Sequence, residues 1–308
     1  MEMLDPNSVL VTGGRGFIGS AVRKLLHRSG YVVLALDQPE SVTGAGDFSL
    51  GREIAIDITD REQLGSLFHT GAIAAIVHLA AILPTVAQRE PARATQVNVE
   101  GSLNLLEMAR QFHVQRFLFG SSLSVYGTCP ADQVVTETDR AAPEDLYGGA
   151  KLYVEQLGEA YRHAHGLEFV SLRIGRVVGL GARSATSAWR SEIFECLEKA
   201  GPAEIEIPYA DSERILLVHV EDVAKMILQL LQAPRPAHNV YNAACESVIV
   251  GELKREIERL NPRLRVKLGG QAVVGNPRRV EWSRLAGEFG FGIVPIFEQL
   301  AWAADGRR

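Results

Sequence analysis

Three residues in the middle of the chain have side chains suited to moving a proton to or from an alcohol. Tyr147 and Lys151 are four positions apart, so on a helix they face the same side. A tyrosine hydroxyl titrates at about 10, and a neighbouring ammonium lowers that pKa toward neutral pH, where the phenol becomes a useful acid–base catalyst. Ser122 follows an apolar run that predicts a strand ending at Gly120. Because parallel strands present ligands at their carboxyl ends, we expect Ser122 to lie beside this pair.

A glycine-rich turn near the amino terminus has the spacing of a dinucleotide site. The segment 12–19 (TGGRGFIG) lies between an apolar strand and an amphipathic helix. Glycines let the backbone turn tightly and approach a pyrophosphate, which the N–H groups at the start of the helix can bind. The residues expected to contact the cofactor here are Gly13, Gly16, Phe17, Ile18 and Gly19.

Asp37 ends the next predicted strand, 18 residues after Gly19. A carboxylate there can accept hydrogen bonds from both ribose hydroxyls and would repel the 2′-phosphate of NADP, so NAD is the expected cofactor. Arg15 argues for NADP, because a guanidinium can pair with that phosphate. Asp57 ends the third predicted strand, where it or the backbone of Ile58 can meet the adenine edge. Asp57 can equally be an acid at the start of the following helix.

The elements that position these residues alternate between short apolar runs and amphipathic segments. This alternation predicts an α/β fold of the Rossmann type, a doubly wound parallel sheet with helices on both faces. The predicted strands span 8–12, 32–36, 53–56, 74–79, 116–120 and 169–173, and the predicted helices span 18–28, 61–68, 97–112 and 147–165.

Beyond about residue 179 the pattern changes to small polar residues, prolines and shorter elements. We therefore predict an NAD-binding domain over 1–179 and a smaller mixed α/β region over 180–308 that mainly binds the substrate. A strand-helix-strand pattern over 216–220, 222–231 and 240–242 predicts that the chain returns to the first domain around 214–245. A further helix is expected over 188–199.

The composition excludes several classes of protein. The 308 residues are 46% apolar, and the net charge of −5 argues against a nucleic-acid partner or an anionic membrane surface. No apolar run approaches the length of a membrane-spanning helix, and the first residues lack the pattern of a signal peptide. The three cysteines are widely spaced, so the chain is expected in the cytoplasm without disulfides. Its histidines lack metal-ligand spacing with acids, so no metal is predicted.

Taken together, these segments resemble the extended short-chain dehydrogenase/reductase family, also called the NAD-dependent epimerase/dehydratase family. The resemblance implies that Tyr147 is the general acid/base, that Lys151 lowers its pKa and binds the nicotinamide ribose, and that Ser122 hydrogen-bonds the reacting hydroxyl. The matching motifs stand in family order over roughly residues 8–245: TGGRGFIG at 12–19, Asp37, Asp57, His78-Leu79-Ala80-Ala81, Asn98, GSSLSVYG at 120–127, YGGAK at 147–151 and Leu172-Arg173.

The same resemblance implies further roles. Ser121 is the alternative to Ser122, and Ser124 is expected to face the substrate. Asn98 can instead cap or bend its helix, and His78 is better interpreted as a packed strand residue than as a base, because no carboxylate partner is evident. The residues expected to line or support the cofactor crevice are Leu79, Ala80, Ala81, Asn98 and Ile174.

The residues after Ser122 restrict the reaction within that family. Dehydratases and decarboxylases place acids there, whereas this chain has Leu123 and Ser124, which favours an epimerase or a plain dehydrogenase. The first interpretation is an NAD-dependent epimerase or oxidoreductase acting on a nucleotide-sugar. The second is an NAD-dependent dehydrogenase of a small hydroxy acid, a sugar acid or a threonine-like substrate. A non-catalytic dinucleotide- or RNA-binding relative fits less well, because the chain keeps both Tyr147 and Lys151.

The predicted substrate-binding residues depend on which interpretation holds. Arg176 replaces an asparagine that often meets the sugar nucleotide in the family, and Arg278 can clamp a diphosphate or a carboxylate or simply lie in solvent. With a small acid as substrate, Arg176 and Arg183 are the candidates to hold its carboxylate. By resemblance, the helical regions 91–112 and 147–165 are expected to pair with those of a second subunit in a homodimer.

Overall fold

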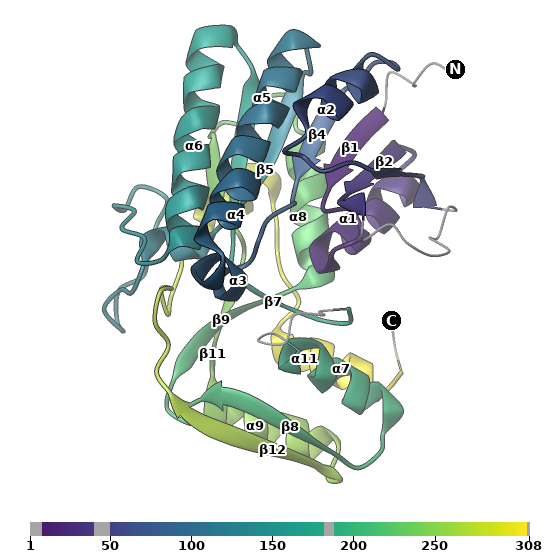
Figure 1. The fold of residues 1–308 in the computed structure, drawn as a ribbon. Coiled ribbons are helices and arrows are strands. Elements are labelled where there is room, and N and C mark those ends of the chain that lie inside the picture. Colours follow the sequence, from purple (N-terminus) through teal and green to yellow (C-terminus); the bar gives the residue numbers. More distant parts are fainter. Residues whose placement is uncertain (1–7, 40–49, 182–187, 307–308) are drawn as a thin grey trace.

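A parallel seven-stranded sheet carries the amino-terminal half of the chain in the computed structural model, which describes residues 8–39, 50–181 and 188–306 (Figure 1). The strand order is β3-β2-β1-β4-β5-β6-β10, and every neighbouring pair is parallel. The order reverses between β1 and β4, which opens a crevice at their carboxyl ends. The strands are β1 (Ser8–Thr12), β2 (Val32–Asp37), β3 (Arg52–Ala55), β4 (Ala75–His78), β5 (Arg116–Ser122), β6 (Glu168–Ile174) and β10 (Val240–Asn242).

Helices cover both faces of this sheet, because successive side chains of a strand point to opposite faces. In β1, Val9 and Val11 pack into the cluster that contains α1 and α8, whereas Leu10 packs on the other side with α2, α5 and α6. The two layers are visible in Figure 1. The predicted doubly wound parallel sheet is therefore confirmed. The helices are α1 (Phe17–Arg28), α2 (Arg61–Phe68), α5 (Ser102–Gln111), α6 (Leu146–His165) and α8 (Val220–Gln232).

The carboxyl-terminal region forms the smaller part of the molecule, in the lower half of Figure 1. It has a three-stranded sheet of order β11-β9-β7, a two-stranded sheet of β12 and β8, and its own apolar core. The strands are β7 (Arg176–Val178), β8 (Ala203–Tyr209), β9 (Arg214–His219), β11 (Glu246–Ile249) and β12 (Leu264–Gln271), and the helices are α7 (Trp189–Lys199), α9 (Val250–Leu260), α10 (Ser283–Phe289) and α11 (Ile296–Ala304).

One part of the predicted return to the first domain is wrong. The predicted strand 216–220 lies in β9, which pairs with β7 and β11 in the smaller part and does not join the large sheet. The next two elements do return, since α8 packs on α1 and β10 pairs with β6. The apolar pattern of a buried strand is the same in either sheet, so the pattern alone could not select the partner strand.

The predicted helix 97–112 is interrupted. It consists of a π-helical turn (Gln96–Gly101) followed by α5, and two short helices, α3 (Pro84–Arg89) and α4 (Pro91–Thr95), precede it. The side chain of Asn98, within the π-turn, forms two hydrogen bonds with the backbone of Ile82. The widened turn thus brings an amide to the loop that follows β4, as π-turns often do near functional sites.

Within the three described ranges, no helix combines the length and the apolar character needed to span a lipid bilayer. The longest helix, α6, has 20 residues, but charged and polar side chains recur along it. Its apolar side packs against the large sheet.

Candidate active site

The turns that follow β1 and β4 are held together by Thr12. Its hydroxyl accepts hydrogen bonds from the backbone N–H groups of Leu79 and Ala80, both at 3.2 Å. The same hydroxyl lies 2.7 Å from Nδ1 of His78. These contacts join the glycine turn to the segment His78–Ala81 that the sequence analysis placed at the cofactor crevice.

The glycine turn is too tight for side chains at two of its positions. Gly13 has a φ of +66°, and a Cβ atom there would lie 2.8 Å from the backbone nitrogen of Ala80. A Cβ at Gly19 would lie 2.1 Å from the carbonyl oxygen of Gly13.

Helix α1 starts after Gly16 without a side-chain cap, so its first N–H groups face this turn without a side-chain partner. A pyrophosphate fits this arrangement, because the bare backbone allows close approach and the N–H groups supply hydrogen-bond donors. Phe17 and Ile18 form the first residues of α1, where the sequence placed them.

Asp37 stands at the carboxyl end of β2, where a ribose would lie. Its carboxylate accepts hydrogen bonds of 3.0 Å from the backbone nitrogens of Arg15 and Gln38. The guanidinium of Arg15 lies 3.3 Å from Glu53, with which it forms an ion pair. Because Glu53 already offsets this charge, the geometry supports NAD over NADP.

Asp57 and Ile58 follow β3. The carboxylate of Asp57 accepts two hydrogen bonds from Thr59, and the neighbouring Asp60 caps α2. Asp57 therefore lies three residues before the cap of α2, which leaves its interpretation as an acid near the start of that helix open. The carbonyl of Ile58 accepts a hydrogen bond from Asn104. The contact of these two residues with adenine stays a prediction.

Ser122, Tyr147 and Lys151 lie where β5 ends and α6 begins. Asp145 caps α6 through a 2.6 Å hydrogen bond from the backbone nitrogen of Gly148, which orients the first turn containing Tyr147. The hydroxyl of Ser122 lies close enough to Tyr147 to lower the pKa of the phenol slightly. Lys151, one turn later, is buried and donates a 2.7 Å hydrogen bond to the carbonyl of Gly120. The structure thus brings the three predicted catalytic residues together.

The two neighbouring serines have different surroundings. Ser121 donates a 2.5 Å hydrogen bond to Glu155, which forms a buried ion pair with Arg173. Ser122 instead accepts a 2.9 Å hydrogen bond from the hydroxyl of Ser124. This arrangement supports Ser122 over Ser121 as the residue that meets substrate, and it places Ser124 in direct contact with Ser122.

The pKa of Tyr147 shifts in the direction opposite to the expectation. Desolvation, together with the charge of Asp145, raises the pKa of Tyr147 to about 12. Arg190 and Ser122 lower it by a smaller amount. Burial also lowers the pKa of Lys151 to about 7. The nitrogen of Lys151 lies 5.5 Å from the centre of the Tyr147 ring. Desolvation thus dominates the pKa of Tyr147 in this structure, and Lys151 is not among the groups that act on it. The lowering of that pKa by Lys151 stays a prediction.

His78 is a buried structural residue. Its two ring nitrogens contact the hydroxyls of Thr12 and Ser102, and burial lowers its pKa to about 3. The ring is therefore neutral at physiological pH, and it has no carboxylate partner among the hydrogen bonds of the described residues. This agrees with the packed-strand interpretation of His78.

The remaining predicted cofactor residues lie around the crevice. Ala81 follows Ala80 in the loop after β4, and Asn98 holds this loop through Ile82. Ile174 is buried at the end of β6, paired in register with Ser122. Direct contact of these residues with the dinucleotide stays a prediction.

The predicted substrate residues differ in their surroundings. Arg278 forms an ion pair of 3.1 Å with Glu213, and Arg183 lies outside the described residues. Arg176 donates a hydrogen bond to the hydroxyl of Tyr209 at 3.2 Å. Arg190, whose charge acts on both Arg176 and Tyr147, is not among the residues predicted from the sequence. One signal was available, since Arg190 is a cation in the first turn of a helix, where the dipole disfavours it.

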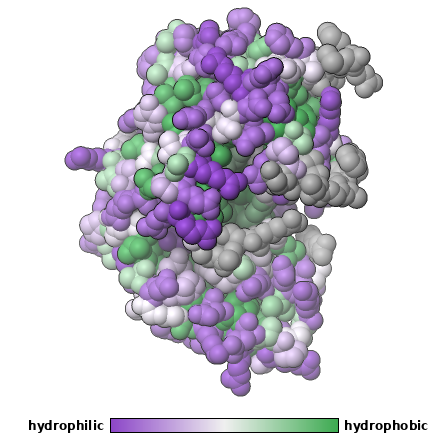
Figure 2. Space-filling view, in the orientation of Figure 1, coloured by the Kyte–Doolittle hydropathy of each residue, from purple (hydrophilic) through white to green (hydrophobic). Residues whose placement is uncertain are grey.

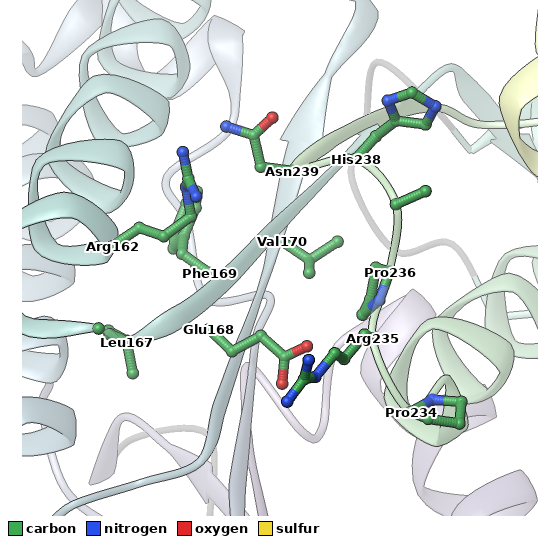
Figure 3. A pocket seen from close by; sticks show the side chains of 12 residues that line it. Arg162, Leu167, Glu168, Phe169, Val170, Pro234, Arg235, Pro236, His238 and Asn239 are labelled. Atoms are coloured by element: carbon green, nitrogen blue, oxygen red, sulfur yellow. The ribbon is translucent and has the colours of Figure 1, made fainter.

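The structure also contains a cavity of about 530 Å³ away from these residues. It is lined by the end of α6, the start of β6 and the loop before β10 (Figure 3). Ser122 lies at the opposite end of the sheet, because Glu168 at the start of β6 pairs with Arg116 while Ile174 pairs with Ser122. The active site is instead expected at the recess between the two parts of the molecule, part of which is visible in Figure 2. No group of three or more histidine, cysteine or acidic residues within 8–39, 50–181 and 188–306 has the arrangement of a metal site.

The fold and this site define an NAD-dependent enzyme with a Rossmann-type domain. The chain belongs to the NAD dependent epimerase/dehydratase family, whose sequence profile matches residues 9–244. This is the family to which the motifs pointed, and NAD is its cofactor.

Relatives of two activities resemble the chain. It is 26% identical to bovine mitochondrial L-threonine 3-dehydrogenase over 271 residues, which cover 85% of this chain and 70% of the relative. It is 36% identical to UDP-glucose 4-epimerase from Erwinia amylovora over 186 residues, which cover 56% of this chain and 54% of the relative. The dehydrogenase match is thus longer, and the epimerase match is closer in identity.

Solved structures of both kinds share the fold. L-threonine dehydrogenase from Phytophthora infestans has a TM-score of 0.86 at 23% identity and covers 97% of this chain and 99% of its own. UDP-glucose 4-epimerase from Thermus thermophilus, in complex with NAD, has a TM-score of 0.83 at 25% identity and covers 97% of this chain and 98% of its own. The fold is thus common to an epimerase and a dehydrogenase.

Proposed function

We propose that this enzyme oxidises and reduces a secondary alcohol carbon of a sugar or small hydroxy acid, with Ser122, Tyr147 and Lys151 as its catalytic residues. The observation that carries the proposal is the position of Tyr147 beside Ser122, with the nitrogen of buried Lys151 5.5 Å from the Tyr147 ring. This group lies at the carboxyl end of β5, two strands from the glycine turn after β1. An open parallel sheet binds its ligands at this edge.

Each side chain has a role that follows from its contacts. Bound NAD supplies a nicotinamide ring that accepts a hydride from the alcohol carbon. Tyr147 removes the hydroxyl proton during oxidation and returns it during reduction, while Ser122 hydrogen-bonds the substrate oxygen. Lys151 in its charged form stabilises the phenolate of Tyr147. Its remaining N–H groups are expected to bind the nicotinamide ribose, since only one is used by Gly120.

Two substrate classes fit this chemistry. An epimerase returns the hydride to the other face of a nucleotide-sugar, as the similarity to UDP-glucose 4-epimerases suggests. A dehydrogenase releases the ketone of a small hydroxy acid, sugar acid or threonine-like substrate, and the longer match to a threonine dehydrogenase supports this alternative. Leu123 and Ser124 after the serine are compatible with both.

One experiment separates the two classes. The freshly purified enzyme is denatured, and any released dinucleotide is identified by mass spectrometry and quantified per chain. The enzyme is then supplied with UDP-glucose, L-threonine, sugar acids or small hydroxy acids, and both NADH formation and sugar epimers are measured. Retained NAD with an epimerised sugar and no net NADH supports the epimerase. An enzyme that binds NAD reversibly and forms NADH from an acid supports the dehydrogenase.

The role of Tyr147 is tested on whichever substrate turns over. Tyr147→Phe is expected to lower kcat by about 10²- to 10⁴-fold, the usual contribution of a general acid–base catalyst. NAD affinity, measured by fluorescence titration, is expected to stay nearly unchanged. A phenylalanine variant that kept most of its activity would contradict the proposed acid–base role and with it the proposed function.

We also expect a homodimer, in agreement with the apolar side chains that α5 and α6 expose. Leu103 on α5 is 36% exposed, and Tyr153 on α6 is 50% exposed. Sedimentation analysis of the full chain measures this state, and a monomer at micromolar concentration would contradict the expectation. The cytoplasmic location stays a prediction.

A further inference from the structure

Arg176 is a charged residue whose hydrogen-bonding capacity is only partly used. It is the first residue of β7, and its Nε donates to the hydroxyl of Tyr209 at 3.2 Å while its guanidinium lies 5.4 Å from the centre of that ring. Its Nη1 atom is buried and has no hydrogen-bond partner in the described structure. A buried guanidinium donor without a partner is costly, so such a group normally meets an anion or an acceptor.

Arg190 brings a second positive charge to the same place. It lies in the first turn of α7, where the helix dipole is also positive, and no side chain caps this end of the helix. The carbonyl of Arg190 accepts a hydrogen bond from Gly179, the residue after β7, which fixes the start of α7 against that strand. Desolvation and the charge of Arg176 together lower the pKa of Arg190 to about 10.

No described acid compensates these two charges. The groups whose charges act on Arg190 are Arg176, Tyr209 and Tyr147, and none of them is a carboxylate. Among the ion pairs of the described residues, neither Arg176 nor Arg190 takes part in one. A fully buried arginine contrasts with these two partly buried ones, since Arg173 pairs with Glu155 at 2.7 Å.

The two arginines also lie next to the proposed catalytic group. Residue Ile174, which ends β6, is paired in register with Ser122 and is only two positions before Arg176. The charge of Arg190 acts on the hydroxyl of Tyr147 itself. An anion between the two guanidiniums would therefore belong to the part of the substrate that carries the reacting alcohol.

We propose that Arg176 and Arg190 form an anion subsite that binds the carboxylate of a small substrate beside its reacting hydroxyl, with Tyr209 orienting Arg176. The inference rests on the proposed function and selects its second substrate class, an acid. A diphosphate has the same charge chemistry, but in a nucleotide-sugar the sugar ring separates it from a hydroxyl at the far side of the ring. The nearness of Arg190 to Tyr147 therefore favours a carboxylate attached close to the alcohol carbon.

The test measures anion binding, so it does not depend on knowing the substrate. The NAD-loaded enzyme is titrated calorimetrically with acetate, with the neutral isostere acetamide, and with UDP. We expect acetate to bind and acetamide not to bind. Arg176→Gln and Arg190→Gln are each expected to weaken acetate binding by about tenfold or more, the usual effect of removing one charge-assisted hydrogen bond.

The matched control is Arg259→Gln, which also removes one guanidinium from the smaller part but lies on the exposed surface of α9 beside Glu256. It is expected to leave acetate affinity unchanged. NAD affinity is measured for all variants and is expected to be unchanged, which shows that each variant is folded.

The outcomes separate the subsite from the catalytic proposal. Any of three results would overturn the carboxylate subsite. In the first, acetate and acetamide bind equally well. In the second, Arg176→Gln and Arg190→Gln leave the acetate affinity unchanged, and in the third only the binding of UDP depends on the two arginines. Acetate binding that requires both arginines supports it even if Tyr147→Phe keeps its activity, a result that would overturn only the acid–base assignment.

Discussion

The glycine turn after β1 and the contact between β7 and α7 hold the two proposed binding sites, but they are built in different ways. In the glycine turn, backbone atoms approach each other closely, and Thr12 joins the turn to the loop after β4 through two hydrogen bonds. Where α7 contacts β7, the charges of Arg176 and Arg190 act on each other, no described acid pairs with either, and Nη1 of Arg176 lacks a partner. The proposed cofactor site thus depends on backbone shape, whereas the proposed substrate subsite depends on charge.

The arginines of the two regions also differ in whether an acid compensates their charge. In the large domain, the charges of the buried arginines are compensated by acids, for example Arg23 of α1 by Glu53 at 3.0 Å and Arg173 of β6 by Glu155 at 2.7 Å, although Nε and Nη2 of Arg23 have no hydrogen-bond partner. Each of these charges already has an opposite charge beside it within the chain, so no ligand is needed to compensate it. An uncompensated pair such as Arg176 and Arg190 costs stability and is better explained by a ligand that completes it.

The largest expected effect in this comparison comes from adding one methyl group to the glycine turn. In Gly19→Ala the new Cβ would lie 2.1 Å from the carbonyl of Gly13, so the backbone must move. We expect NAD affinity to fall by about 100-fold, equivalent to about 2.7 kcal/mol, because the displaced N–H groups lose their phosphate contacts. Fluorescence titration with NAD measures this effect.

The control for that substitution is a glycine on the surface of a helix. Gly65 lies in α2, and a Cβ there would meet no atom within 4 Å. Gly65→Ala is expected to raise the free energy of unfolding by about 0.5–1 kcal/mol and to leave NAD affinity unchanged. If Gly19→Ala bound NAD as well as Gly65→Ala does, the cofactor site would not depend on backbone shape.

A smaller effect is expected where a single charge contributes to the cofactor site. Asp37→Ala should lower the preference for NAD over NADP by about 10- to 100-fold, because it removes both the acceptor for the ribose hydroxyls and the repulsion of a 2′-phosphate. The ratio of the two dissociation constants measures the preference. Asp57→Ala, at the end of the next strand, is expected to change both affinities alike. An unchanged ratio in Asp37→Ala would remove Asp37 from the ribose.

The smallest expected effect depends on pH and concerns the smaller part of the molecule. Burial lowers the pKa of His219 to about 4, so between this value and 6.5 the unfolded chain binds a proton that the folded chain does not. The wild-type protein therefore loses stability as the pH falls through this window. His219→Asn should remove about 1–2 kcal/mol of the loss between pH 7 and pH 5, as measured by urea unfolding at both values.

Asparagine suits this test because His219 caps α8 by accepting a hydrogen bond from the backbone nitrogen of Glu221, and asparagine is a good cap. His78 in the large sheet has its pKa lowered to about 3 and should retain its own share of the acid dependence in the variant. An identical pH dependence in wild type and His219→Asn would show that His219 is not a source of it.

Most of the large sheet was predictable from the sequence. The predicted strand 8–12 and helix 61–68 coincide with β1 and α2, and the other predicted strands of the sheet differ from the structure by a few residues at most. Apolar runs and glycine positions act over short distances along the chain, so they can be recognised without knowing the fold. The grouping of Ser122 with Tyr147 was predictable for the same reason, since both follow recognisable local elements.

The sequence by itself determined the fold class, the family and the cofactor, because a glycine turn between a strand and a helix already specifies how a backbone meets a pyrophosphate. Only the tertiary structure decided that β9 pairs with β7, that desolvation raises the pKa of Tyr147, and that Arg190 lies with Arg176. Burial and the distance between two charges depend on segments far apart in the chain. Local sequence patterns carry no information on them, and for this reason the substrate site, unlike the cofactor site, required the folded molecule.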